Sequence, residues 1–154
     1  MMKSILIIIA MLLSSVVLQA QKVDVKNNKI LVDKEEIATI EEVRRSFGAL
    51  CTYYIRNSEG KTLITVLVLD YYDRNERNQV DPTGRVIYFR LSFADEKGVA
   101  EIPYTARDAK GVAEIIVRAK LIKDNELDDY EVRQFIQAHG TRYYGRQTQS
   151  NTIY

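Results

Sequence analysis

Cys51 and His139 are the single cysteine and the single histidine of the 154-residue chain. A thiol hydrolase would need both, as nucleophile and as base. A catalytic cysteine usually lies at a helix N-terminus, where the helix dipole lowers the pKa of the thiol. Cys51 lies instead in the strand-like run of residues 49–55, and His139 directly precedes Gly140 at a predicted helix end, where a cation is favourable. We therefore expect Cys51 to be a buried, unreactive thiol, and the sequence predicts no catalytic residue.

Two segments have a superficial likeness to calcium loops. In residues 70–78, Asp73 and Asn75 fit two alternate ligand positions, but the glycine that the loop needs for its turn is missing. In the second segment, residues 120–131, the alignment places Lys120 and Ile122 at the first ligand positions, where neither side chain can coordinate a cation. One histidine and one cysteine cannot build a usual zinc site. The sequence thus predicts neither a metal site nor a cofactor.

Other classes of function are disfavoured by composition and by motif. The formal net charge is +1, so there is no electrostatic case for nucleic acid as a partner. The chain contains neither a Gly-x-Ser-x-Gly motif nor a glycine-rich phosphate loop. A carbohydrate enzyme could still draw its two carboxylates from distant parts of the sequence.

Tyrosine is the unusual residue of this composition, since the chain has ten tyrosines and no tryptophan. Adjacent tyrosines in a strand face opposite sides, so one ring of a pair packs and the other is free to meet a sugar or a peptide. The C-terminal segment adds two arginines, and arginine and tyrosine both stack well on a partner. The candidate contact residues for a ligand or a partner are therefore Tyr71, Tyr72, Arg142, Tyr143 and Tyr144.

Residues 1–20 have the three parts of a secretory signal peptide. These are a cationic start at Lys3, an apolar stretch from Ile5 to Leu18, and small Ala20 at the predicted cleavage point. The apolar stretch is shorter than the roughly 20 residues that span a bilayer, so we expect no stable membrane insertion after cleavage. The ending Gln19-Ala20-Gln21 resembles the export signals of Bacteroidota. This resemblance implies that the mature chain works in the periplasm or outside the cell.

The remainder of the chain predicts one α+β domain over residues 21–140, followed by a polar, mobile tail over residues 141–154. Residues 22–104 read as an antiparallel meander with recognisable turns, in which residues 37–43 form a weaker strand with some helical character. An apolar stripe from Ala109 to Ala119 predicts a first helix of about four turns. Asp128 and Glu131 predict a capping box that starts a second helix, which ends at Gly140. We expect both helices to cover one face of the sheet.

These observations favour an exported, non-catalytic binding or structural module of a bacterial cell envelope. Its partner would be another envelope protein or a saccharide, with no nucleic acid involved. The alternative is a binder of a small ligand, such as a sugar, a peptide or a lipid-like molecule, in a cavity between sheet and helices. A small secreted hydrolase is the third hypothesis.

The signal peptide gives the first testable prediction. Protein recovered from the producing cell should begin at Gln21, because cleavage follows Ala20. Intact-mass measurement checks this, with allowance for cyclisation of the N-terminal glutamine. A chain that begins at Met1 and sediments with membranes would contradict both the cleavage and the export.

Overall fold

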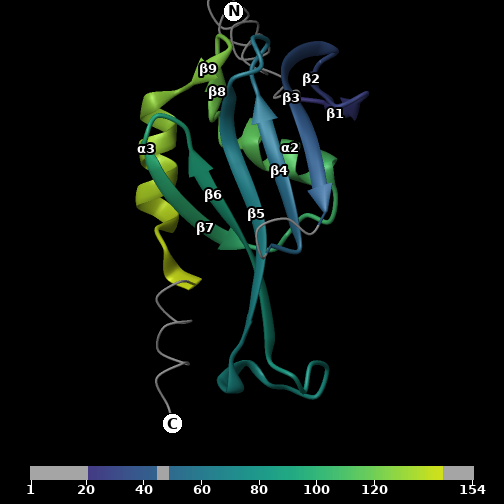
Figure 1. Cartoon of the computed structure of the whole chain (residues 1–154), viewed down its shortest axis with the longest axis vertical. Helices are drawn as coiled ribbons and strands as arrows, with labels where there is room; N and C mark the ends of the chain where they lie inside the picture. Colours follow the sequence, from purple (N-terminus) through teal and green to yellow (C-terminus); the bar gives the residue numbers. More distant parts are fainter. Residues whose placement is uncertain (1–20, 45–48, 144–154) are drawn as a thin grey trace, which may run out of the picture.

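The computed structural model describes residues 21–44 and 49–143. Seven strands form one antiparallel sheet, and their order across the sheet is their order in the sequence (Figure 1). The predicted meander, followed by two C-terminal helices in an α+β fold, is confirmed. The strands are β1 (Val23–Lys26), β2 (Lys29–Val32), β3 (Glu35–Arg44), β4 (Cys51–Arg56), β5 (Thr62–Tyr72), β6 (Arg85–Phe93) and β7 (Gly98–Pro103).

Short turns with positive φ angles join the first strands and fix their register. Asn27 and Asn28 adopt φ angles of 50° and 61°, which asparagine tolerates better than most residues, and they close the β1–β2 hairpin. Asp33 and Lys34 adopt φ angles of 51° and 76° between β2 and β3. The helical alternative for residues 37–43 is wrong, because they lie inside the ten-residue strand β3, where Ala38 and Ile40 alternate into the core.

The strand β5 lies inside the sheet, between β4 and β6, and its apolar residues alternate between the two faces. Ile64, Val66 and Val68 point to the face that carries the helices, and all three are buried. β5 and β6 continue together beyond their neighbours, since β4 pairs with β5 only as far as Val68. Figure 1 shows the resulting two-stranded ribbon extending away from the rest of the sheet.

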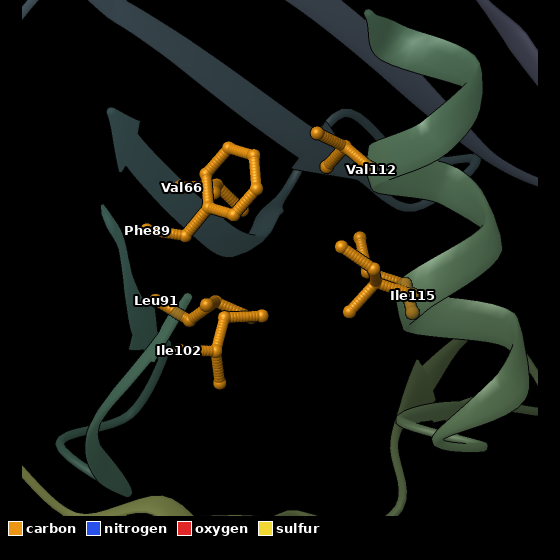
Figure 2. Close-up of a pocket in the computed structure, with 7 residues that line it drawn as sticks. Val66, Phe89, Leu91, Ile102, Val112 and Ile115 are labelled. Atoms are coloured by element: carbon orange, nitrogen blue, oxygen red, sulfur yellow. The ribbon is translucent and has the colours of Figure 1, made fainter. Parts of the chain in front are cut away.

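The helix α2 (Ala109–Arg118) packs across one face of the sheet through Val112, Ala113 and Ile116, all of them buried. Figure 2 shows how Val112 and Ile115 face side chains from three strands, namely Val66, Phe89, Leu91 and Ile102. Among these residues the packing leaves no volume that would admit a water molecule. The stripe of apolar residues was therefore read correctly, although the helix ends at Arg118 and is shorter than four turns.

The segment after α2 contains a small hairpin where the sequence suggested only a loop. Its strands are β8 (Ile122–Lys123) and β9 (Glu126–Leu127), and the turn residues Asp124 and Asn125 adopt φ angles of 49° and 69°. Leu121, just before the hairpin, is fully buried. The hairpin thus redirects the chain from α2 into the next helix.

The helix α3 (Asp129–His139) lies beside β7 on the face that also carries α2. Its Phe135 ring meets Phe93 edge to face, with the ring centroids 6.2 Å apart. An added Cβ atom at Gly98 would lie 3.1 Å from Cδ1 of Ile136, so the glycine lets helix and strand approach closely. Gly140, with a φ angle of 58°, ends the helix as predicted.

Asp128 caps α3 through its own side chain. Its Oδ1 accepts hydrogen bonds from the backbone N–H groups of Tyr130 at 3.0 Å and Glu131 at 3.1 Å. In a complete capping box, the side chain of Glu131 would accept from the backbone N–H of Asp128. That N–H donates instead to the carbonyl oxygen of Leu121, at 3.0 Å. Asp128 therefore joins the β8–β9 hairpin to α3.

The Asp128 cap gives a stability prediction. Asp128→Ala should lower the free energy of unfolding by about 1 kcal/mol, because two N–H groups of the first turn lose their acceptor. Asp128→Asn is the matched control and should keep most of the stability, since asparagine caps about as well as aspartate. Chemical denaturation measures both variants, and equal losses in the two would contradict a capping role.

Candidate functional site

A cleft opens on the helix-bearing face, at the end of the sheet from which the β5–β6 ribbon extends. Its volume is about 260 Å³. We call it the arginine cleft, because two guanidinium groups lie among the side chains that line it. The lining residues are Glu42, Arg44, Leu50, Cys51, Tyr53, Val68, Ile87, Tyr104 and Arg107.

The antiparallel register brings the sheet residues of the cleft together. Arg44 of β3 is opposite Cys51 of β4, and Cys51 is opposite Val68 of β5. Because residues opposite one another share a face, this row forms one side of the cleft. Leu50 is held next to the row by a hydrogen bond from its N–H to the carbonyl oxygen of Val68, at 2.8 Å.

The other side of the cleft comes from the connection between β7 and α2. The Tyr104 ring packs on Phe89, with centroids 5.0 Å apart and planes inclined by 43°. Ala106 is buried against the first turn of α2, where a Cβ atom at Gly111 would lie 2.6 Å from the Cβ of Ala106. Only a glycine fits at that position. The connection is therefore fixed, and it holds Arg107 at the cleft.

The charges of the cleft are two cations and one anion. Arg44 Nε donates to Glu42 Oε1 at 2.9 Å, so this pair is largely neutralised at the surface. Arg107 forms no ion pair with another residue of the described chain. An exposed guanidinium with no ion-pair partner among the described residues is well suited to hold a carboxylate or a phosphate.

The thiol and the phenol on the floor of the cleft are not activated for nucleophilic chemistry. Burial raises the pKa of Cys51, and the phenol of Tyr53 has its pKa raised by burial and by the neighbouring thiol. Cys51 is partly buried and lines the cleft, so the expected full burial of this thiol is not seen. The thiol and the phenol on the floor of the cleft are therefore better suited to packing against a ligand than to transferring a proton.

His139 lies elsewhere, in the last turn of α3. Its ring packs on Phe135 with centroids 4.5 Å apart, and burial and then the nearby charge of Arg142 lower the pKa of the imidazole. It is not among the residues that line the arginine cleft around Cys51. The two residues thus have separate surroundings in separate elements.

A second cluster lies on the face of the sheet opposite the helices. The rings of Tyr88 and Tyr143 stack with centroids 4.7 Å apart, and Tyr71 meets Tyr88 edge to face at 6.0 Å. Glu101 is buried beside them and accepts a hydrogen bond from the backbone N–H of Tyr143, at 2.7 Å. The guanidinium of Arg90 lies 3.9 Å from the same carboxylate.

The structure separates the five contact residues predicted from the sequence. Tyr71 is buried and Tyr143 is half-buried in the tyrosine cluster, whereas Tyr72 remains 62% exposed. Arg142 is exposed and donates to the carbonyl oxygen of Ala138. Tyr144, with the rest of the predicted tail to residue 154, lies outside the described residues.

Comparisons with models of known families, with curated proteins and with solved structures give no match for this chain. Within the described residues, no three histidine, cysteine, aspartate or glutamate side chains gather as metal ligands would. A search of the same part of the chain finds no helix long and apolar enough to cross a membrane.

Sequence reasoning considered Cys51 and Tyr53 as strand residues but did not identify the cleft that they line. Alternation in the strands places Cys51 and Val68 on one face, but it does not show that this end of the face is left open. Arg107 and Tyr104 belong to an irregular connection, and a pattern of residues does not reveal where such a connection lies. The cleft was therefore missed for lack of a periodic signal.

Cys51 gives the third prediction. Because burial raises the pKa of its thiol above the ordinary value, little thiolate exists at neutral pH, and a disulfide reagent should label the folded protein slowly. The labelling rate of the folded protein should still rise with pH above the pH at which the labelling rate of the protein unfolded in urea has become constant. Fast labelling of the folded protein at pH 7 would contradict this account of the thiol.

Proposed function

We propose that the protein is an exported, non-catalytic binding module of a bacterial cell envelope and that it holds its ligand in the arginine cleft. The observation that carries this proposal is the combination of an apolar floor with two guanidinium groups. Val68, Ile87 and Tyr53 offer contact area, while Arg44 and Arg107 offer donors to an anionic group. A hollow of this kind, with a few converging polar groups, is the usual form of a ligand site.

The chemistry of the lining residues supports binding over bond cleavage. The thiol of Cys51 has a raised pKa, and the carboxylate of Glu42 is already paired with Arg44. A hydrolase in this cleft would need a base close to the thiol, and none of the residues lining it is a histidine. We therefore keep the hydrolase as the least supported of the three hypotheses.

The position of the cleft also bears on the alternative of a ligand cavity between sheet and helices. The side chains of α2 and the sheet that face one another in Figure 2 leave no volume for a water molecule, so this interface would have to open before a ligand could enter. The arginine cleft is already open, so it needs no such rearrangement. The envelope partner that we propose is a protein or a saccharide that reaches the molecule at this end of the sheet.

The fourth prediction tests the proposed function. In an amide NMR titration, one of three probe classes should shift the signals of cleft residues such as Leu50, Cys51 and Arg107. The probes are short peptides, an oligosaccharide and a short-chain fatty acid. Tyr104→Ala should weaken binding by about tenfold, since it removes an aromatic wall. Tyr130→Ala, at an exposed tyrosine on α3, is the matched control and should bind like the unchanged protein.

Two results would contradict the proposed function. One is that all three probe classes leave the cleft signals unchanged. The other is that a bound probe is converted in excess over the protein, because turnover would make the molecule an enzyme.

A further inference from the structure

We infer that the ligand of the arginine cleft is an extended peptide that pairs with an open edge of β3. The peptide places an apolar and an acidic side chain over the cleft. This inference rests on the proposed function, since it names the ligand class of the same site.

Residues 41–44, at the end of β3, have no described strand beside them on the side away from β4. The pairing of β2 with β3 runs from Glu35 to Thr39, and the β1–β2 hairpin turns back at this point. Among the described residues, the last backbone hydrogen bond on this side runs from Ile40 N–H to the carbonyl oxygen of Asn28, at 2.8 Å. Figure 1 shows β3 continuing past the hairpin, with the green chain that leads into α2 drawn beside its lower end.

The direction of the free backbone groups follows from the alternation of a strand. In an antiparallel ladder, the N–H and C=O groups of every second residue point to the same side. The N–H of Ile40 points away from β4, and the register from Ile40 to Arg44 is continuous opposite β4. The backbone N–H and C=O groups of Glu42 and Arg44 therefore also point away from β4. No described strand pairs with them on that side. These two residues present the edge groups to which another strand can bond.

The open edge adjoins the cleft, because the side chains of the same two residues line it. Glu42 and Arg44 both belong to the wall of the arginine cleft. A strand that pairs with β3 here places every second side chain on the same face as Glu42 and Arg44. Two side chains of such a peptide, at positions i and i+2, therefore face the cleft together.

The volume of the cleft fits a side chain better than a whole ligand. About 260 Å³ is below the roughly 300–1,000 Å³ of pockets that enclose small molecules. The apolar floor of Val68, Ile87 and Tyr53 calls for a large apolar or aromatic side chain. The backbone hydrogen bonds along β3 then contribute the affinity that so small a hollow cannot give alone.

The charge of the cleft selects the second side chain. Arg44 and Arg107 outnumber Glu42, and Arg107 has no ion-pair partner within the described chain. An acidic side chain on the peptide, two residues from the apolar one, would reach this guanidinium from the same face. Recognition of a carboxylate by arginine is charge-assisted and directional.

A second copy of this chain is a poorer occupant of the same edge. If β3 paired with β3 of another molecule, the side chains brought to the cleft face would again be those of Glu42 and Arg44. Neither side chain supplies an apolar group for the floor of the cleft. The peptide is therefore the favoured occupant, and self-association is an outcome that the experiment can detect.

The fifth prediction uses the peptide acetyl-Thr-Phe-Thr-Asp-Thr-amide as the probe, with the protein recovered after export. The phenylalanine and the aspartate of this peptide lie on one face when it is extended. In an NMR titration it should shift the amide signals of Glu42, Arg44 and Cys51. Methylation of one backbone nitrogen of the peptide should weaken binding by at least tenfold when that N–H points at β3. Methylation at the residues in between should have little effect, because only every second N–H points at β3.

Protein variants test the charge separately from the backbone. Arg107→Gln should weaken binding of the peptide about two- to fivefold, the range expected for an exposed ion pair. It should not change binding of the peptide in which asparagine replaces aspartate. Arg118→Gln, at an exposed arginine of α2, is the matched control and should leave both affinities unchanged.

Three results would overturn the inference. Equal tolerance of N-methylation at every position would mean that the peptide binds without pairing with β3. A dimer that forms at the concentrations used, and that protects Glu42 and Arg44, would make a second copy the occupant. Binding of the oligosaccharide or the fatty acid, with no effect of the peptide, would overturn the inference but leave the proposed function intact.

Discussion

The packing of α2 across the central strands is the contact on which the rest of the structure depends. Val112 and Ile116 are buried against side chains of β5, β6 and β7, α2 also lies close to β1, β2 and β3, and burying a side chain such as Ile116 contributes about 1.5–3 kcal/mol. Because α2 must reach this position from the end of β7, the connection through Tyr104 and Arg107 passes the open end of the sheet. The wall formed by Tyr104 and Arg107 therefore depends on the docking of α2, whereas the opposite wall is set by the register of β3, β4 and β5.

The two sides of the sheet are completed in different ways. At β7, the backbone N–H of Glu101 donates to the carbonyl oxygen of Gly140 at 2.7 Å, so the end of α3 covers this edge. The buried Glu101 carboxylate would be costly alone, but it accepts from Tyr143 N–H and lies near Arg90. At β3 no described strand covers the residues beyond Ile40. The β7 edge is thus bonded to the end of α3, whereas residues 41–44 of β3 have no described strand beside them.

Local patterns were sufficient to predict most of the fold. Alternation gave the strands, the asparagine pair gave the β1–β2 turn, and Asp128 with Gly140 gave both ends of α3. Each of these signals acts within a few residues. The β8–β9 hairpin was missed because its strands are too short to alternate, and the cleft was missed because its walls come from distant segments. The tyrosine pairs predicted one packed and one exposed ring, as seen for Tyr71 and Tyr72, but they did not indicate which of the two rings is packed.

An open edge usually needs protection, because unpaired backbone groups invite association with any extended chain. Glu41, Glu42 and Arg44 place charges along this part of β3, and the ion pair of Arg44 with Glu42 adds to that protection. Charged side chains disfavour pairing with a purely apolar strand, because such a strand has no group that could bond to them. They do not discourage a strand that carries its own carboxylate to Arg107 and an apolar group to the floor of the cleft. In the peptide site that we propose, the charges beside the edge would therefore favour a strand that carries a carboxylate over a purely apolar one.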